Sequence, residues 1–416
     1  MFRYRSQLVL SLWVGFTVLP HESVARSGER PRSFQTLPSR RVFVGVDVLE
    51  EQAFHLLRGK RIGLITNQTG VDFEGRRTID VLASAPDVKL VALFSPEHGI
   101  AGKSQDATIA DSTDKTTALP IYSLYGNTRR PTTEMLKGID LLLFDIQDAG
   151  VRFYTYVTTM AYSMEAAASH HIPFVVLDRP DPLGGEVIEG PMLDPGRTSF
   201  TAYFPLPVRY AMTIGELAKM FNAENHIGAD LQIVLTRNWR RRELYDQTGL
   251  AWISPSPNLR TFHENLLYPG VEILQAGGVS VGRGTDTPFE IIGAPWIQPE
   301  AFAAELNRRN IPGVRLKSTS FIPSEGPYEA ENCGGVRIRI TDRDSFRSIR
   351  LGLEIADALN RMYPQQFQLQ KAIALLGSQS TIDRLMSGDA PASIIASWSA
   401  DLDKFRKMRE KYLLYH

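Results

Sequence analysis

The chain has 416 residues and carries equal numbers of basic and acidic side chains, 46 of each, so its formal net charge is zero. This balance argues against a nucleic-acid partner or a charged membrane surface, and any anionic ligand must be bound by a local pocket. The length favours two domains, and a composition of 43% hydrophobic and 22% charged residues is ordinary for a globular protein.

The N-terminal segment has the pattern of a secretory signal peptide. Two arginines precede the apolar run LVLSLWVGFTVL, and the small residues Ser23 and Ala25 fit a cleavage site. The run is too short to span a bilayer as a helix, although an uncleaved membrane anchor remains an alternative. We therefore expect residues 1–25 to be removed on export, a secreted or periplasmic location, and no membrane contact after cleavage. The Pro- and Ser-containing residues 26–41 are interpreted as a linker.

Short apolar runs alternate with helical patterns from about residue 60 onward. Strands are predicted for RIGLIT, VKLVALF, DLLLFDI, PFVVLD and LQIVLT. Helices are predicted between them for TIDVLASA, YVTTMAYSMEAAASHH and TIGELAKMFNAENH. Such alternation predicts an α/β fold with a doubly wound, mostly parallel sheet.

The last part of the chain follows a different pattern. Between Trp252 and Trp296 glycine and proline are dense and periodicity is weak, which predicts long ordered loops carrying a site. The later runs VRLKSTSF and GVRIRITD alternate with period two, and RSIRLGLEIADALNRMY is an amphipathic helix. We therefore expect a sheet domain over residues 42–245 and a smaller α+β C-terminal domain over residues 246–416 that contributes loops to the cleft.

Polar side chains follow four consecutive predicted strands. Ligands of open parallel sheets bind beyond the carboxyl ends of the strands, so these side chains predict a site at one edge of the sheet. They are Asn67, Gln68 and Thr69 after the first strand, Ser95, Glu97 and His98 after the second, Asp145, Gln147, Asp148, Arg152, Tyr154 and Tyr156 around the third, and Asp178, Arg179 and Asp181 around the fourth.

Several chemistries lack their motifs. There is no Gly-x-Gly-x-x-Gly after the first strand and no Walker loop, so no nucleotide cofactor is expected. Ser95 near His98 lacks a Gly-x-Ser-x-Gly elbow, which leaves an amidase or esterase as a weaker alternative. Cys333 is the only cysteine and no His-x-x-x-His or Asp-x-Asp spacing occurs. We expect no metal, although the strand-end aspartates could form an oxygen-rich site.

The remaining carboxylates, with aromatic residues and arginines, indicate glycoside cleavage. That reaction requires one protonated acid at the leaving oxygen and another carboxylate that stays ionised. Glu97 stands out because it follows Pro96 at a strand exit and has no evident capping role. Asp145 has the alternative of pairing with an arginine. The catalytic candidates are Glu97, His98, Asp145 and Asp148.

Ten blocks of the sequence, spread from about Val44 to the C-terminus, resemble the NamZ family of exo-β-N-acetylmuramidases. The blocks are GLITNQTGVD, LFSPEHGIAG, IYSLYG, DIQDAGVRFYTYV, VLDRPDPLGG, AMTIGELA, SPSPNL, SVGRGTDTPFEIIGAPW, ITDRDSF and KYLLY. The resemblance implies a Rossmann-like catalytic domain with an auxiliary C-terminal domain. It also implies an exported hydrolase that removes terminal β-linked N-acetylmuramic acid from peptidoglycan fragments, with Glu97 as the catalytic glutamate and no cofactor.

Substrate-binding candidates come from the strand ends and from the later blocks. Among them Arg283 is favoured for the lactyl carboxylate of N-acetylmuramic acid, because arginine binds carboxylates bidentately and two small neighbours allow close approach. The set is Asn67, Thr69, Gln147, Arg152, Tyr154, Arg179, Asn258, Arg283, Thr285 and Glu290.

The sequence departs from the usual family pattern at two places. Gln275 stands where the family usually has glutamate, and Gly278 stands where it usually has asparagine. Tyr210 and Ala211 replace a common His-Gly pair. These changes fall in or near the expected cleft and bear on sugar specificity. A weakened enzyme, or a protein that binds muropeptides or sugars without cleaving them, therefore remains the alternative function.

Overall fold

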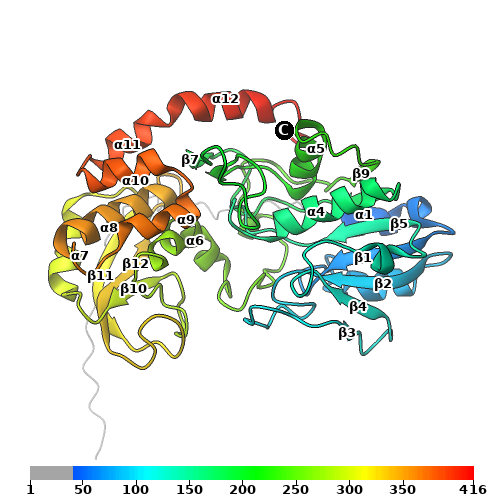
Figure 1. The fold of residues 1–416 in the computed structure, drawn as a ribbon, viewed down its shortest axis with the longest axis horizontal. Helices are drawn as coiled ribbons and strands as arrows, with labels where there is room; N and C mark the ends of the chain where they lie inside the picture. Colours follow the sequence, from blue (N-terminus) through cyan, green and yellow to red (C-terminus); the bar gives the residue numbers. More distant parts are fainter. Residues whose placement is uncertain (1–40) are drawn as a thin grey trace, which may run out of the picture. The chain divides into compact units, whose positions relative to one another are not determined.

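The computed structural model describes residues 41–416 (Figure 1). The predicted signal peptide and all of the predicted linker except Arg41 lie outside the described residues. Within the described range, no helix combines the length and the apolar character needed to cross a membrane.

A seven-stranded sheet with the order β3-β4-β2-β1-β5-β6-β9 forms the N-terminal part. Neighbouring strands run parallel except β3, which pairs antiparallel with β4 at one edge. The order reverses between β1 and β5, which is the point where open α/β sheets bind ligands. The strands are β1 (Arg61–Thr66), β2 (Lys89–Ser95), β3 (Ser112–Thr113), β4 (Pro120–Ser123), β5 (Leu141–Asp145), β6 (Phe174–Leu177) and β9 (Leu231–Val234).

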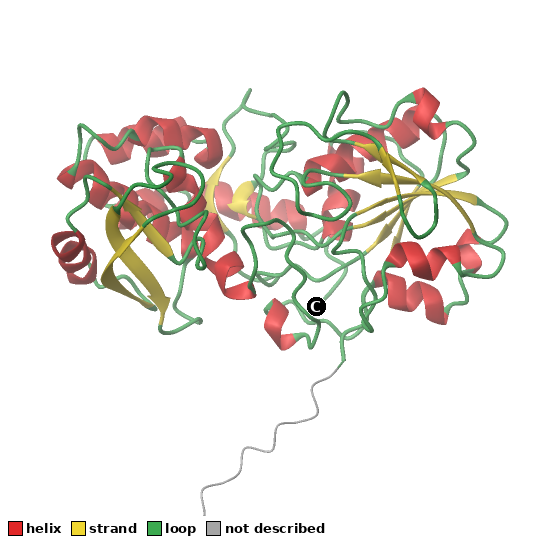
Figure 2. Ribbon diagram, turned by 90° about the horizontal axis from the view of Figure 1, so that it is seen from below, coloured by secondary structure: helices red, strands yellow, loops and turns green. Residues whose placement is uncertain are grey.

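Helices cover both faces of this sheet (Figure 2). Alternate residues of β5 explain why both faces are apolar: Leu141 and Leu143 belong to one buried cluster, whereas Leu142 and Phe144 belong to the other. A strand buried on both sides has a continuous apolar run, as the sequence shows. The helices of this part are α1 (Gly45–Glu51), η1 (His55–Leu57), α2 (Thr78–Ala83), α3 (Thr133–Leu136), α4 (Tyr156–Ser169), α5 (Ile214–Glu224) and η2 (Tyr245–Gln247).

The C-terminal part contains a three-stranded antiparallel sheet with the order β10-β12-β11. A separate hairpin joins β7 (Glu189–Met192) and β8 (Pro207–Arg209). The predicted α/β class, with a mostly parallel sheet and a smaller α+β C-terminal part, is confirmed. The remaining elements are α6 (Phe262–Gln275), β10 (Ile291–Ala294), α7 (Pro299–Arg308), β11 (Val314–Phe321), β12 (Cys333–Ile340), α8 (Ser348–Met362), η3 (Leu369–Ala372), α9 (Ile373–Leu376), α10 (Gln379–Met386), α11 (Pro391–Ser397) and α12 (Ser399–Arg409).

The prediction of long loops between Trp252 and Trp296 is wrong over helix α6. A capping box starts this helix: the Thr261 hydroxyl accepts from the Glu264 amide at 3.2 Å, and the Glu264 carboxylate accepts from the Thr261 amide at 2.7 Å. Pro269 lies inside the helix and conceals it, because proline normally marks a helix boundary. Packing against α8 stabilises the helix despite the proline.

The C-terminal tail after α12 returns to the sheet domain, and Figure 1 shows the chain end beside α5. The Tyr415 hydroxyl donates to the buried Asp178 carboxylate at 2.5 Å. The Leu414 amide donates to Glu216 of α5 at 2.8 Å. The end of the chain is therefore part of the folded structure around β6.

Candidate active site

A cavity of about 560 Å³ opens beyond the C-terminal ends of β2, β4 and β5. Its size suits a sugar-sized ligand. The wall combines side chains of the sheet domain with side chains of α6 and the loop that follows it. Those that carry the argument are Glu97, His98, Tyr154, Tyr268, Glu272 and Arg283.

Glu97 is a half-buried carboxylate in this wall. The Thr155 hydroxyl donates to its Oε2 atom at 2.5 Å, and Thr155 is the N-cap residue directly before α4. Tyr125 lines the same cavity, and burial, with a smaller contribution from the Glu97 charge, raises the pKa of its phenol. Glu97 is thus oriented by the Thr155 hydroxyl while it lines the cavity.

His98 adopts a left-handed backbone conformation, with φ of 69°. Histidine is one of the residues that adopt this region more readily than most non-glycine residues. The imidazole Nδ1 atom lies 2.8 Å from the Ser104 carbonyl oxygen, which can only accept, so Nδ1 carries the hydrogen. In the neutral ring Nε2 is then a hydrogen-bond acceptor.

Arg283 lines the cavity in an ion pair. Its Nη2 atom lies 2.8 Å from Glu272 Oε1, and its Nε atom donates to Gln275 Oε1 at 2.9 Å. Burial raises the pKa of Glu272, and the Arg283 charge opposes that rise. Gln275 therefore contacts a charged pair of the cavity. Gly278 has φ of 94°, a conformation that glycine adopts without strain.

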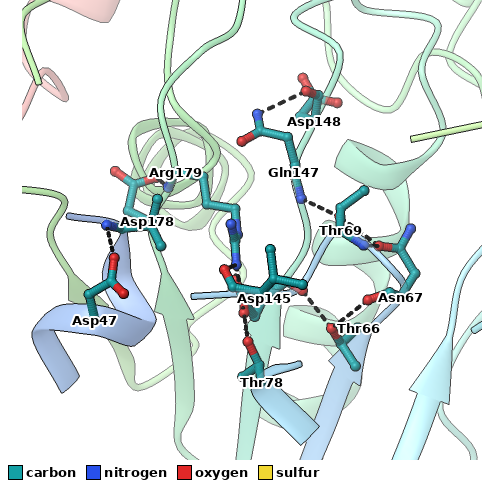
Figure 3. Close-up of polar contacts among 12 residues, drawn as sticks. Asp47, Thr66, Asn67, Thr69, Thr78, Asp145, Gln147, Asp148, Asp178 and Arg179 are labelled. Atoms are coloured by element: carbon teal, nitrogen blue, oxygen red, sulfur yellow. Dashed lines mark hydrogen bonds and ion pairs between the residues drawn. The ribbon is translucent and has the colours of Figure 1, made fainter. Parts of the chain in front are cut away.

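Asp145 and Arg179 do not line the cavity but pair with each other inside the protein, as Figure 3 shows. The Arg179 Nε atom donates to one Asp145 oxygen at 2.6 Å and the Nη2 atom to the other at 2.9 Å. The Thr78 hydroxyl also donates to Asp145. Both side chains are at most 3% exposed. This bidentate pair satisfies both charges and leaves neither residue free for a substrate.

Three of the predicted polar residues form one hydrogen-bonded group at the ends of β1 and β5 (Figure 3). The Thr69 hydroxyl donates to Asn67 Oδ1 at 2.6 Å and accepts from the Gln147 amide at 2.9 Å. All three are buried. They link the ends of β1 and β5, the neighbouring strands between which the strand order reverses, and they do not form the cavity wall.

Asp148 and Arg152 also point into the protein. Asp148 accepts from the Gly150 amide at 2.8 Å and from the Tyr210 hydroxyl, and burial raises its pKa to about 6. Arg152 is 2% exposed. It donates to four backbone carbonyls, those of Pro191, Leu206, Leu375 and Leu376. The structure therefore gives Arg152 the role of joining the β7–β8 hairpin to the C-terminal helices.

The remaining predicted residues lie outside the wall of the main cavity. Asn258 and Thr285 line a neighbouring cavity of about 220 Å³, which shares Gln105 with the main one. Glu290 lies 3.4 Å from Arg337 on the C-terminal sheet. Ser95 is buried at 2% exposure and does not line the main cavity. Within residues 41–416, no cluster of three His, Cys, Asp or Glu side chains has the geometry to hold a metal ion.

Sequence reasoning missed several side chains of the site, among them Tyr268 of α6. Thr155 was passed over between two tyrosines, and Glu272 belongs to the unpredicted helix α6. Tyr125 lies in the IYSLYG block and Arg129 three residues after it, so the signal for both was that block and not a strand end. Phe200 lies in an irregular loop and had no signal. These residues line the cavity or contact Glu97: Tyr125, Arg129, Thr155, Phe200 and Glu272.

The cavity at the C-terminal edge of the α/β sheet holds two carboxylates with aromatic rings and arginines, which are the groups that a glycoside hydrolase uses. Comparison with known proteins gives the family. The family model for the N-terminal domain of exo-β-N-acetylmuramidase NamZ matches residues 62–263, and the model for its C-terminal domain matches residues 266–415. The chain belongs to the NamZ family.

Individual relatives agree with this assignment. The peptidoglycan β-N-acetylmuramidase NamZ of Bacillus subtilis (strain 168) is 43% identical over 385 residues, which cover 92% of this chain and 93% of the relative. Crystal structures of two DUF1343 family proteins from Bacteroides fragilis are 39% and 29% identical, with TM-scores of 0.84 and 0.75. They cover 90% and 91% of this chain and 99% of their own chains.

Proposed function

We propose that this protein is an exo-acting glycoside hydrolase that releases terminal β-linked N-acetylmuramic acid from peptidoglycan fragments. The observation that carries the proposal is Glu97, an accessible carboxylate held by Thr155 in a sugar-sized cavity. Membership of the NamZ family and the 43% identity to a peptidoglycan β-N-acetylmuramidase support the substrate class.

In the proposed mechanism Glu97 is the general acid. Its proton passes to the glycosidic oxygen as the bond to the anomeric carbon breaks, and the sugar develops the charge of an oxocarbenium ion. The rings of Tyr154 and Tyr268 lie 6.0 Å apart in the wall and offer apolar surface to the sugar. Water supplies the hydroxyl group of the product.

Glu272 is the proposed second carboxylate. Among the described residues, it is the only acidic side chain besides Glu97 that lines the cavity. Burial raises the pKa of Glu272, and the ion pair with Arg283 opposes that rise. The proposed role requires the charged form, which stabilises a positive sugar centre or activates water. This role replaces Asp145 and Asp148, whose oxygens are directed into the protein.

A second function has one specific observation in its favour. Gln275 is a neutral side chain at a position where the family usually has glutamate. It accepts a hydrogen bond from Arg283, which pairs with Glu272. A protein that binds muropeptides and cleaves them slowly would fit this change. Binding without release of sugar would identify it.

Export to the periplasm or outside the cell is part of the proposal. It rests on the basic, apolar and small-residue pattern of residues 1–25. Intact-mass analysis of protein from the extracytoplasmic fraction should give a chain that begins after about Ala25. Recovery of the full-length chain in the cytoplasm would contradict it.

The activity is tested with defined glycan fragments that carry N-acetylmuramic acid at the non-reducing end. Chromatography with mass detection should show free N-acetylmuramic acid and a fragment shortened by one sugar. A matched fragment ending in N-acetylglucosamine should remain intact. Internal cleavage, or no cleavage of either fragment, would rule out the exo-muramidase assignment.

A further inference from the structure

Two arginines, Arg129 and Arg283, line the main cavity. They differ in whether a carboxylate of the protein lies beside the guanidinium. Arg283 has Glu272 at 2.8 Å, so a bound anion would compete with that carboxylate. Arg129 has no carboxylate oxygen within 4.0 Å among residues 41–416. It is exposed to the cavity. Arg129 is therefore the cavity cation with charge available for a ligand.

Aromatic rings hold the Arg129 guanidinium in place. It lies 4.0 Å from the centre of the Phe200 ring and 5.4 Å from the centre of the Tyr125 ring. Stacking of this kind leaves the edge of the guanidinium free to donate hydrogen bonds. The two rings also contact each other, with centres 5.9 Å apart.

The backbone around Arg129 is fixed as well. The Thr128 hydroxyl accepts from the Arg130 amide at 3.0 Å and donates to the Arg130 carbonyl at 2.7 Å. Ser199 and Thr201, on either side of Phe200, line the same cavity with their hydroxyl groups 3.2 Å apart. A carboxylate at Arg129 would thus meet a preorganised cation beside neutral donors, which limits the entropy lost on binding.

The acid and the cation belong to the same cavity wall, and Tyr125 neighbours both. Glu97, Tyr125 and Arg129 all line the main cavity. The Arg129 guanidinium lies 5.4 Å from the centre of the Tyr125 ring, and the Glu97 charge contributes to the raised pKa of the Tyr125 phenol. In a pyranose the anomeric carbon and the carbon at position 3 belong to one ring, so a group on O3 is within comparable reach of the scissile bond.

We infer that Arg129, stacked on Phe200, forms the subsite that recognises a carboxylate substituent of the terminal sugar. The inference rests on the proposed function and deepens it. It assigns the carboxylate specificity to Arg129 and leaves Arg283 to hold Glu272. The substrate class is then an amino sugar with a free carboxylate on its ring substituent.

The test compares two chromogenic substrates, 4-nitrophenyl β-N-acetylmuraminide and its lactyl N-methylamide, which lacks the negative charge. Wild-type protein should prefer the acid by about tenfold to a hundredfold in kcat/KM, the worth of a charge-assisted hydrogen bond. Arg129→Ala should reduce this preference to about threefold or less, mainly through KM on the acid.

Arg130→Ala is the matched control. Arg130 is adjacent and also stacks on an aromatic ring, Tyr162 at 3.7 Å, but it pairs with Glu165 and does not line the cavity. This variant should keep the wild-type preference. Arg283→Ala tests the rival assignment, and abolition of the preference in that variant while Arg129→Ala retains it would overturn the inference. Equal losses on both substrates in Arg129→Ala would also overturn it.

Calorimetric titration with free N-acetylmuramic acid decides the inference without turnover. Binding to Arg129→Ala should be at least about tenfold weaker than binding to wild type, and N-acetylglucosamine should bind both proteins alike. Unchanged binding of N-acetylmuramic acid would refute the subsite. If wild type cleaves neither chromogenic substrate, the proposed function fails separately, and the titration still reports on Arg129.

Discussion

At the scale of single residues, three buried aspartates contribute to the pH dependence of stability. Burial raises the pKa of Asp148 and of Asp178 to about 6 and that of Asp181 to about 7. In the unfolded chain these groups lose their protons near pH 4. Between these pH values the folded state binds more protons than the unfolded state. Stability should therefore fall as the pH rises from about 4 to about 7.

Replacement of Asp148 by asparagine removes one of these titrating groups while it keeps an acceptor for Tyr210. Asp148→Asn should make the fall of the melting temperature between pH 4 and pH 6 less steep. Asp140→Asn is the control, because Arg61 lowers the pKa of Asp140 to about 2 and any slope it contributes lies below pH 4. Thermal melts across the pH range measure both. An unchanged slope in Asp148→Asn would contradict the assignment.

At the scale of elements, helix α6 is the member that connects the site to the C-terminal part. It places Tyr268 and Glu272 in the cavity wall and packs against α8. Close approach of the two helices depends on glycine: a Cβ atom at Gly270 would lie 1.8 Å from the Ser348 carbonyl oxygen. No larger residue fits there without movement of one helix.

Gly270→Ala should therefore destabilise the protein even though alanine normally favours a helix. Overpacking costs about 1–3 kcal/mol, and backbone contact places this site at the upper end. Glu300→Ala, on an exposed position of α7, is the control and should change stability by less than about 0.5 kcal/mol. Urea unfolding gives both values. Wild-type stability in Gly270→Ala would show that the α6–α8 contact is loose.

At the scale of the whole molecule, the C-terminal tail ties the end of the chain to the sheet domain. Tyr415 is buried at 8% exposure, and its hydroxyl donates to Asp178 and accepts from the Thr236 amide at 3.0 Å. Loss of a hydrogen bond to a buried acid costs about 1.5–3 kcal/mol. Tyr415→Phe should show this loss in urea unfolding.

Tyr412→Phe is the matched control for the tail. Tyr412 makes the same kind of bond to Glu224, but it is more exposed to solvent and its loss should cost less than about 1 kcal/mol. Similar unfolding curves for the two variants would mean that the tail docks without contributing to stability.

The sequence predicted the parallel sheet well because its strands are continuous apolar runs separated by helical periods. It missed α6 because Pro269 and Gly270 interrupt the helical pattern, and only packing against α8 explains why the helix persists. For the site, strand ends identified Glu97 and His98 in the cavity wall. They could not show that Arg179 pairs with Asp145, since pairing depends on three-dimensional distance. Phe200 could not be found because it comes from an irregular loop.

The catalytic role of Glu97 is decided by the rate of Glu97→Gln on 4-nitrophenyl β-N-acetylmuraminide. Glutamine keeps the shape of the side chain but cannot donate the proton, so the rate should fall by about 10²- to 10⁴-fold. Glu134→Gln, an exposed residue of α3, should act at the wild-type rate. The Glu97 variant should also melt like wild type and still bind N-acetylmuramic acid. A near wild-type rate in Glu97→Gln would contradict the mechanism.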